Sequence, residues 1–134
     1  MFAFIGLIIS SGFAVIFIGL GLPLYFKKVK RNYFYGYRVS HYAMLDEEIW
    51  YEVNHLGGKH LIVMGSLLAG NALFAWLFLD HVQVQSIILN TDGVIVIGGF
   101  IYSIIRGKHL NNELATAKGL TNHLYPAVQY KVSE

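Results

Sequence analysis

The segment KKVKRNYFYGYRVSHYAMLDEEIWYEVNHLGGK, residues 27–59, separates two long apolar runs and decides how the chain folds. The run before it, residues 2–26, contains no charged side chain. At about 1.5 Å per residue, a helix over this run exceeds the roughly 30 Å hydrocarbon core of a bilayer. We therefore predict a transmembrane helix over residues 2–26, with Pro23 in its last turns, where a proline is tolerated.

Two further apolar runs, residues 61–79 and 86–105, follow the segment and are separated by a short polar turn. Asn71 and Asp92 interrupt them at similar distances from that turn, so an antiparallel hairpin places both at one depth. A carboxylate in mid-bilayer costs about 3 kcal/mol on insertion scales. We favour a polar clasp between Asn71 and Asp92 that fixes the register of the hairpin. The alternative is a proton or ligand site open to the outside.

Composition supports a membrane protein. Hydrophobic residues make up 55% of the chain and charged residues 13%, against roughly 25% charged in soluble domains. The 134 residues leave room for one domain. The absence of cysteine excludes disulfides, thiolate metal sites and a cysteine nucleophile. The fold class expected is an all-α integral membrane protein, a single membrane domain with three transmembrane helices.

The basic residues predict the orientation. All 10 Lys and Arg lie either in the segment of residues 27–60 or in the tail of residues 106–134. Three spans place these two regions on the same side of the membrane. By the positive-inside rule, the N-terminus lies outside and the C-terminus in the cytoplasm. We expect anionic lipid headgroups near the first basic cluster, which comprises Lys27, Lys28, Lys30 and Arg31, and no nucleic acid.

Residues 46–58 have the pattern of a short amphipathic helix on the cytoplasmic face. Asp46 is a suitable N-cap, and Glu47 and Glu48 follow in the first turn, where the helix dipole favours carboxylates. Gly57-Gly58 is a typical helix stop. Trp50 and the many tyrosines nearby are expected to form an interfacial aromatic belt. We predict that residues 32–58 form one compact unit.

Two half-motifs in this segment resemble the SdpI family of small bacterial membrane proteins. The first is Asn32-x-x-Tyr35-Gly36-Tyr37-Arg38, and the second is Trp50-x-x-x-Asn54-x-x-x-Gly58, directly before a transmembrane span. The resemblance covers roughly residues 20–80. The family usually continues the arginine with threonine and often proline, whereas Val39-Ser40 follows here.

The resemblance implies a multi-pass protein of the bacterial cytoplasmic membrane. The role that named the family is immunity to a secreted toxic peptide, coupled to sequestering a transcriptional repressor at the membrane. It suggests a non-enzymatic immunity or signalling protein that binds a toxic peptide, a lipid or a regulatory protein through residues 32–58. The alternative is a small accessory subunit of a larger complex, with Gly65, Ser66, Ala69 and Gly70 available for close helix packing. A membrane enzyme acting on lipids ranks third.

The candidate binding residues can also be explained by structural roles within the chain. Arg38 either binds an external phosphate or carboxylate, or forms an ion pair with Glu47 or Glu48. Asn54 either contacts a ligand or caps the second span, and we favour the cap. Gly36 is expected to supply a backbone conformation closed to other residues. The set is Asn32, Tyr35, Gly36, Arg38, Glu47, Glu48, Trp50 and Asn54.

Metal binding and enzymatic chemistry find little support in the sequence. Glu52-x-x-His55 matches half of a carboxylate–histidine motif, but a dimetal bundle needs a second copy and further carboxylates. The sequence has no GxSxG, HExxH or phosphate-loop motif. We expect no cofactor and no metal.

Overall fold

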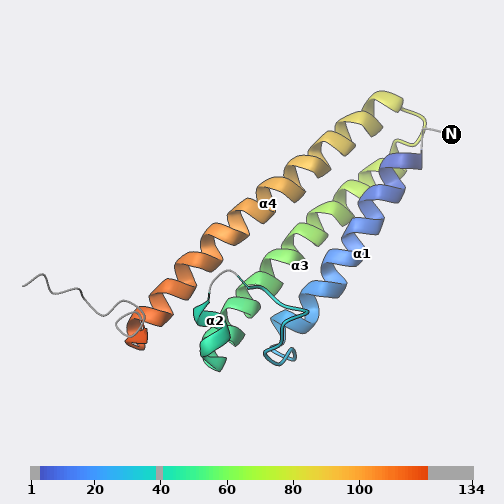
Figure 1. Ribbon diagram of the computed structural model, residues 1–134. Coiled ribbons are helices and arrows are strands. Elements are labelled where there is room, and N and C mark those ends of the chain that lie inside the picture. Colours follow the sequence, from blue (N-terminus) through green and yellow to red (C-terminus); the bar gives the residue numbers. More distant parts are fainter. Residues whose placement is uncertain (1–3, 39–40, 121–134) are drawn as a thin grey trace, which may run out of the picture.

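The structure, a computed structural model, describes residues 4–38 and 41–120. Three long helices run side by side (Figure 1): α1 (Ile5–Tyr25), α3 (Glu47–Leu77) and α4 (Val82–Ala117). A single short turn of helix, α2 (Tyr42–Leu45), precedes α3. All three long helices are long and apolar enough to cross a membrane. The described ranges contain no strand, so the expected all-α membrane fold is confirmed.

The helices alternate in direction. The start of α1 and the turn between α3 and α4 lie at one end of the bundle (Figure 1). The loop after α1, the helix α2 and the end of α4 lie at the other end. The basic residues of the two regions that the structure describes therefore lie at one end of the molecule, at residues 27–38 and 106–118.

Glycines bring α1 and α3 into close backbone contact. A Cβ on Gly21 would lie 2.9 Å from the carbonyl oxygen of Gly58, and one on Gly58 would lie 2.7 Å from the carbonyl oxygen of Gly21. Two helical turns further along α3, a Cβ on Gly65 would lie 3.0 Å from the carbonyl oxygen of Ala14. Small residues allow such approach in membrane helices, where van der Waals packing drives association. Gly65 is therefore used within the chain.

The predicted helix stop at Gly57-Gly58 is wrong. Helix α3 continues through both glycines, so the expected amphipathic helix forms its first turns. Each glycine faces a neighbour too close for a side chain: Gly58 faces α1, and a Cβ on Gly57 would lie 2.8 Å from the ring of Tyr37. Packing against these neighbours offsets the helix-propensity cost of glycine, about 1 kcal/mol each.

Helix α4 is also longer than the expected span of residues 86–105. It continues to Ala117 and ends before Gly119, whose φ is +70°. Within the bundle, a buried apolar cluster of Ala14, Phe17, Met64 and Leu68 joins α1 and α3, and residues of α4 pack against it. The remainder of the predicted tail, residues 121–134, lies outside the described residues.

The lengths of the helices separate a membrane part from a protruding part. Helix α1 has 21 residues, which is about 31 Å, close to the thickness of the hydrocarbon core. Helices α3 and α4 have 31 and 36 residues, about 46 and 54 Å. Because α1 ends beside His55, where the Tyr25 carbonyl oxygen lies 2.6 Å from His55 Nδ1, the surplus of α3 lies beyond that level.

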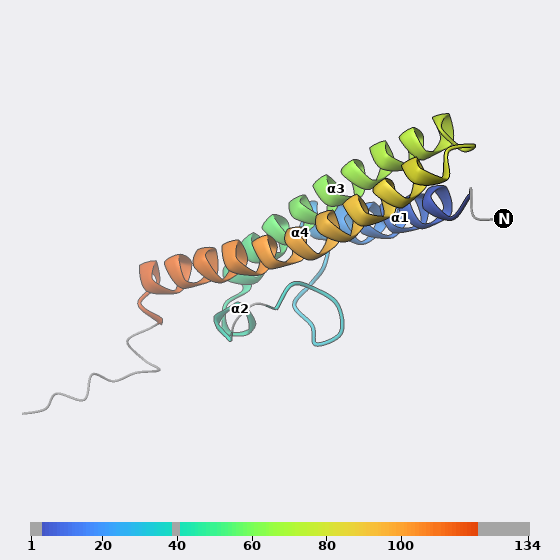
Figure 2. The same cartoon turned by 90° about the horizontal axis from the view of Figure 1, so that it is seen from above.

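We call this protruding part the membrane-proximal unit. It comprises the loop of residues 26–38, α2, residues 47–56 of α3 and residues 106–120. Figure 2 shows the loop and α2 to one side of the three long helices. The unit has its own hydrophobic core, formed by Ala43, Ile49, Trp50, Val53 and Ala115.

Candidate functional site

The two half-motifs meet inside the membrane-proximal unit. Gly36 has φ +136° and lies directly on Trp50 and Asn54, so that a Cβ there would lie 2.6 Å from the Trp50 ring and 2.9 Å from Asn54 Oδ1. The expected special backbone conformation of Gly36 is confirmed. A side chain at this position would both strain the backbone and collide with the indole.

Asn32 builds the turn that leads to Gly36. Its Oδ1 accepts hydrogen bonds from the backbone N–H groups of Phe34, at 2.8 Å, and of Tyr35, at 2.7 Å. Its Nδ2 donates to the Lys30 carbonyl oxygen at 2.8 Å. This is the local side-chain-to-backbone pattern that asparagine favours in turns. The Tyr35 hydroxyl donates to the carbonyl oxygen of Leu20, which fastens the turn to α1.

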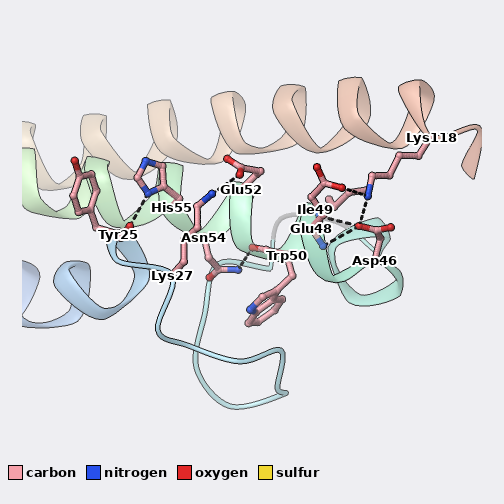
Figure 3. Close-up of polar contacts among 10 residues, drawn as sticks. All are labelled: Tyr25, Lys27, Asp46, Glu48, Ile49, Trp50, Glu52, Asn54, His55 and Lys118. Atoms are coloured by element: carbon pink, nitrogen blue, oxygen red, sulfur yellow. Dashed lines mark hydrogen bonds and ion pairs between the residues drawn. The ribbon is translucent and has the colours of Figure 1, made fainter.

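The sequence predicted that Trp50 belongs to an interfacial aromatic belt, and this prediction is wrong. The Trp50 side chain is fully buried, and its indole Nε1 donates to the Val29 carbonyl oxygen at 3.0 Å. Figure 3 shows the indole on the side of α3 that faces the loop. Burying a tryptophan removes a large apolar surface from water, and the indole N–H has a partner. Trp50 is therefore the main apolar anchor of the loop.

Asn54 holds the loop from the same face of α3. Its Oδ1 accepts a hydrogen bond from the backbone N–H of Tyr37, and its Nδ2 donates to the Trp50 carbonyl oxygen at 2.8 Å (Figure 3 draws the second contact). The side chain is 2% exposed. The expectation that Asn54 caps the second span is wrong, because α3 is continuous and no helix begins there.

Asp46 caps α3 as predicted, accepting from the backbone N–H groups of Glu48 and Ile49 at 3.0 Å each. The expected ion pair between Arg38 and Glu47 or Glu48 is not among the contacts of the described residues. Instead Lys118, at the end of α4, lies 2.8 Å from Asp46 and 2.6 Å from Glu48 (Figure 3).

These contacts shift two pKa values. The hydrogen bond from Lys118, together with the backbone N–H of Ile49, lowers the pKa of Asp46. The hydrogen bonds to Asp46 and Glu48 raise the pKa of Lys118. Lys118 was not a candidate in the sequence, because nothing local links it to a carboxylate on another helix.

The outer surface of the loop is exposed. Phe34 is 97% exposed and Tyr33 74% exposed, and Arg38 is exposed beside them in the chain. Trp50 and Asn54 of α3 therefore hold the inner side of the loop. Two aromatic rings and a guanidinium are exposed on the loop. Arginine and aromatic residues are the types that most often carry binding energy at interfaces.

Glu52 and His55, the half-motif considered for a metal, have other partners. Glu52 pairs with Lys27, and His55 Nδ1 lies 2.6 Å from the Tyr25 carbonyl oxygen, with the two rings stacked 4.7 Å apart (Figure 3). No group of three potential His, Cys, Asp or Glu ligands occurs among the residues described.

A second polar cluster lies between the three long helices. Asn71 Nδ2 donates to Asp92 Oδ1 at 2.7 Å, so the predicted contact between α3 and α4 is present. The Ser10 hydroxyl donates to Asp92 Oδ2. Ser10 was not among the residues predicted from the sequence, although it is one of few polar residues in the first apolar run. Asp92 is 3% exposed and Ser10 is fully buried.

A family model for the SdpI/YfhL protein family matches residues 28–105, more than half of the chain. The match covers both half-motifs, Asn71 and Asp92. No curated protein and no solved structure is significantly similar to the chain. The half-motifs, the three membrane-spanning helices and the family match agree: the chain belongs to the SdpI/YfhL protein family.

Proposed function

We propose that the chain is a non-enzymatic membrane protein of the immunity or signalling type, which binds a toxic peptide or a regulatory protein through the membrane-proximal unit. One observation carries this proposal: the family motif builds a fixed support for a loop whose outer side chains are exposed. Gly36, Trp50 and Asn54 support the loop, and Tyr33, Phe34 and Arg38 face away from the support. A loop ordered in advance loses little entropy when it binds.

The exposed state of Arg38 favours an external partner over an internal role. No carboxylate in the described ranges pairs with it. A guanidinium binds a carboxylate or a phosphate with two parallel hydrogen bonds. Lys28, Lys30 and Arg31 are also exposed, which supports attraction of an acidic partner or of anionic headgroups to the same side.

The direct test is protection of toxin-sensitive bacteria by the expressed chain against the peptide secreted by a producing strain. We expect Phe34→Ala and Arg38→Glu to abolish protection without changing expression or the thermal midpoint. Matched controls are Phe74→Ala, an exposed aromatic on α3, and Lys59→Glu, an exposed cation on α3, both outside the membrane-proximal unit. Full protection by both test variants would refute a role of the loop in immunity.

A second candidate function is that of an accessory subunit. A cavity of about 430 Å³ between α1 and α3 is lined mainly by small residues, among them Gly19 and Ala69, which suits close approach of a foreign helix. A Cβ on Gly19 would meet no atom within 4 Å, so Gly19→Ile fills the cavity without disturbing the fold. If the chain is a subunit, this variant should lose its larger assembly on a native gel, whereas Gly12→Ile should keep it.

A further inference from the structure

A groove runs between α3 and α4 on the membrane side of the unit. Its volume is about 360 Å³, and its walls come from residues 59–67 of α3 and 94–102 of α4. Lys59, His60 and Tyr102 line one end, and the remaining lining residues are aliphatic, methionine or glycine. The groove therefore has one polar end and one apolar end.

Glycine leaves the floor of the groove open. A Cβ on Gly98 would meet no atom within 4 Å, so the missing side chain leaves open space. The adjacent Gly99 is different: a Cβ there would overlap the sulfur of Met64, which closes α4 against α3 at that point. Helix α3 packs less extensively against α4 than against α1.

The polar end carries positive charge. Lys59 and Arg106 are exposed, and neither pairs with a carboxylate in the part of the chain that the structure describes. Arg106 lies one helical turn beyond Tyr102 on α4, and His60 uses Nδ1 to contact the Ser103 hydroxyl at 2.9 Å. An anion at this end would meet two cations and a histidine ring nitrogen.

The groove has the depth of one lipid leaflet. Lys59 lies about 27 Å along α3 from Leu77, close to the thickness of the hydrocarbon core. From Lys59 to Leu67 the groove extends about 12 Å inward.

We propose that this groove binds one acyl chain of an anionic phospholipid from the leaflet on the side of the membrane-proximal unit. The chain lies along Met64, Leu67 and Gly98, and the phosphate is held by Lys59 and Arg106. Apolar walls suit a hydrocarbon chain, and the two cations select an anionic headgroup over a zwitterionic one. This site is separate from the exposed loop and does not depend on the proposed immunity function.

The test uses the full chain in phosphatidylcholine vesicles with a trace of phosphatidylglycerol that carries a diazirine on its acyl chain. The comparison lipid is phosphatidylcholine with the same labelled chain. After illumination, peptide mapping should show more labelling of residues 63–67 and 94–98 by the anionic lipid. Lys59→Gln should reduce this preference about fivefold, and Lys59→Gln/Arg106→Gln should abolish it.

Gly98→Leu, which fills the groove, should reduce labelling of the same peptides by the anionic lipid. Gly70→Leu is the matched control, because a Cβ on Gly70 also meets nothing within 4 Å and Gly70 does not line the groove. Equal labelling by the two lipids in the wild type would overturn the proposal. So would labelling that survives both Gly98→Leu and the double substitution.

Discussion

Asp92 accepts hydrogen bonds from two other helices, Ser10 on α1 and Asn71 on α3. A carboxylate in the membrane is expensive unless such partners satisfy it. Asp92→Asn should be tolerated, since an amide can accept from Asn71 and donate to the Ser10 hydroxyl. Asp92→Leu removes both contacts and should cost about 1–3 kcal/mol of unfolding free energy in mixed micelles.

A double-mutant cycle separates the clasp from a functional site. The loss in Asn71→Leu/Asp92→Leu should be little more than the loss in Asp92→Leu alone, because the two residues share one hydrogen bond. Full additivity would contradict the clasp. Loss of activity in Asp92→Asn at unchanged stability would instead assign Asp92 a functional role.

At the scale of whole elements, the contact between α1 and α3 depends on glycine. Gly58→Ala places a methyl group against the backbone of Tyr25 and Gly21, so the helices must separate. We expect a loss of about 1–3 kcal/mol in unfolding free energy. Gly70→Ala lies on the same helix with no atom near the added methyl group, and should be neutral or stabilise by up to about 1 kcal/mol. Equal effects of the two substitutions would contradict this packing.

The ion pair of Lys118 with Asp46 joins the ends of α3 and α4, and it predicts a pH dependence. The folded-state pKa of Asp46 is lowered, so its contribution is present above the unfolded pKa and is lost as the pH falls through the lowered value. The thermal midpoint of Lys118→Gln should therefore lie slightly below that of the wild type at about pH 7, and the difference should vanish as the pH falls through the lowered pKa of Asp46. Lys108→Gln is the control. A difference that persists in strong acid would show that Lys118 acts by another route.

The sequence contains the local determinants of these elements but not the contacts between them. The Asp46 cap, the turn at Gly36 and the apolar spans follow from neighbouring residues, and all were predicted. Whether Gly57-Gly58 ends a helix depends on what lies beside it, and α1 and Tyr37 lie there. The pairing of Lys118 with Asp46 and the burial of Trp50 likewise depend on residues distant in sequence.

For the whole molecule, the gathering of basic residues at one end predicts its orientation. We expect the N-terminus and the α3–α4 turn outside the cytoplasm, and the membrane-proximal unit inside. The test uses a reporter that is active only in the cytoplasm. It should be active when it is fused after Glu134 and inactive when it is inserted at the turn near Asp80. The reverse pattern would contradict the orientation.

The central claim is that Gly36, Trp50 and Asn54 keep the loop of residues 26–38 in one ordered conformation for binding a partner. Hydrogen-exchange mass spectrometry of the chain in lipid nanodiscs tests it most directly, because the backbone N–H of Tyr37 is bonded to Asn54 Oδ1. The peptide of residues 32–38 should exchange at least about tenfold more slowly in the wild type than in Asn54→Ala, equivalent to about 1.4 kcal/mol. Peptides from α1 should not change. Equally fast exchange of this peptide in both proteins would contradict the account.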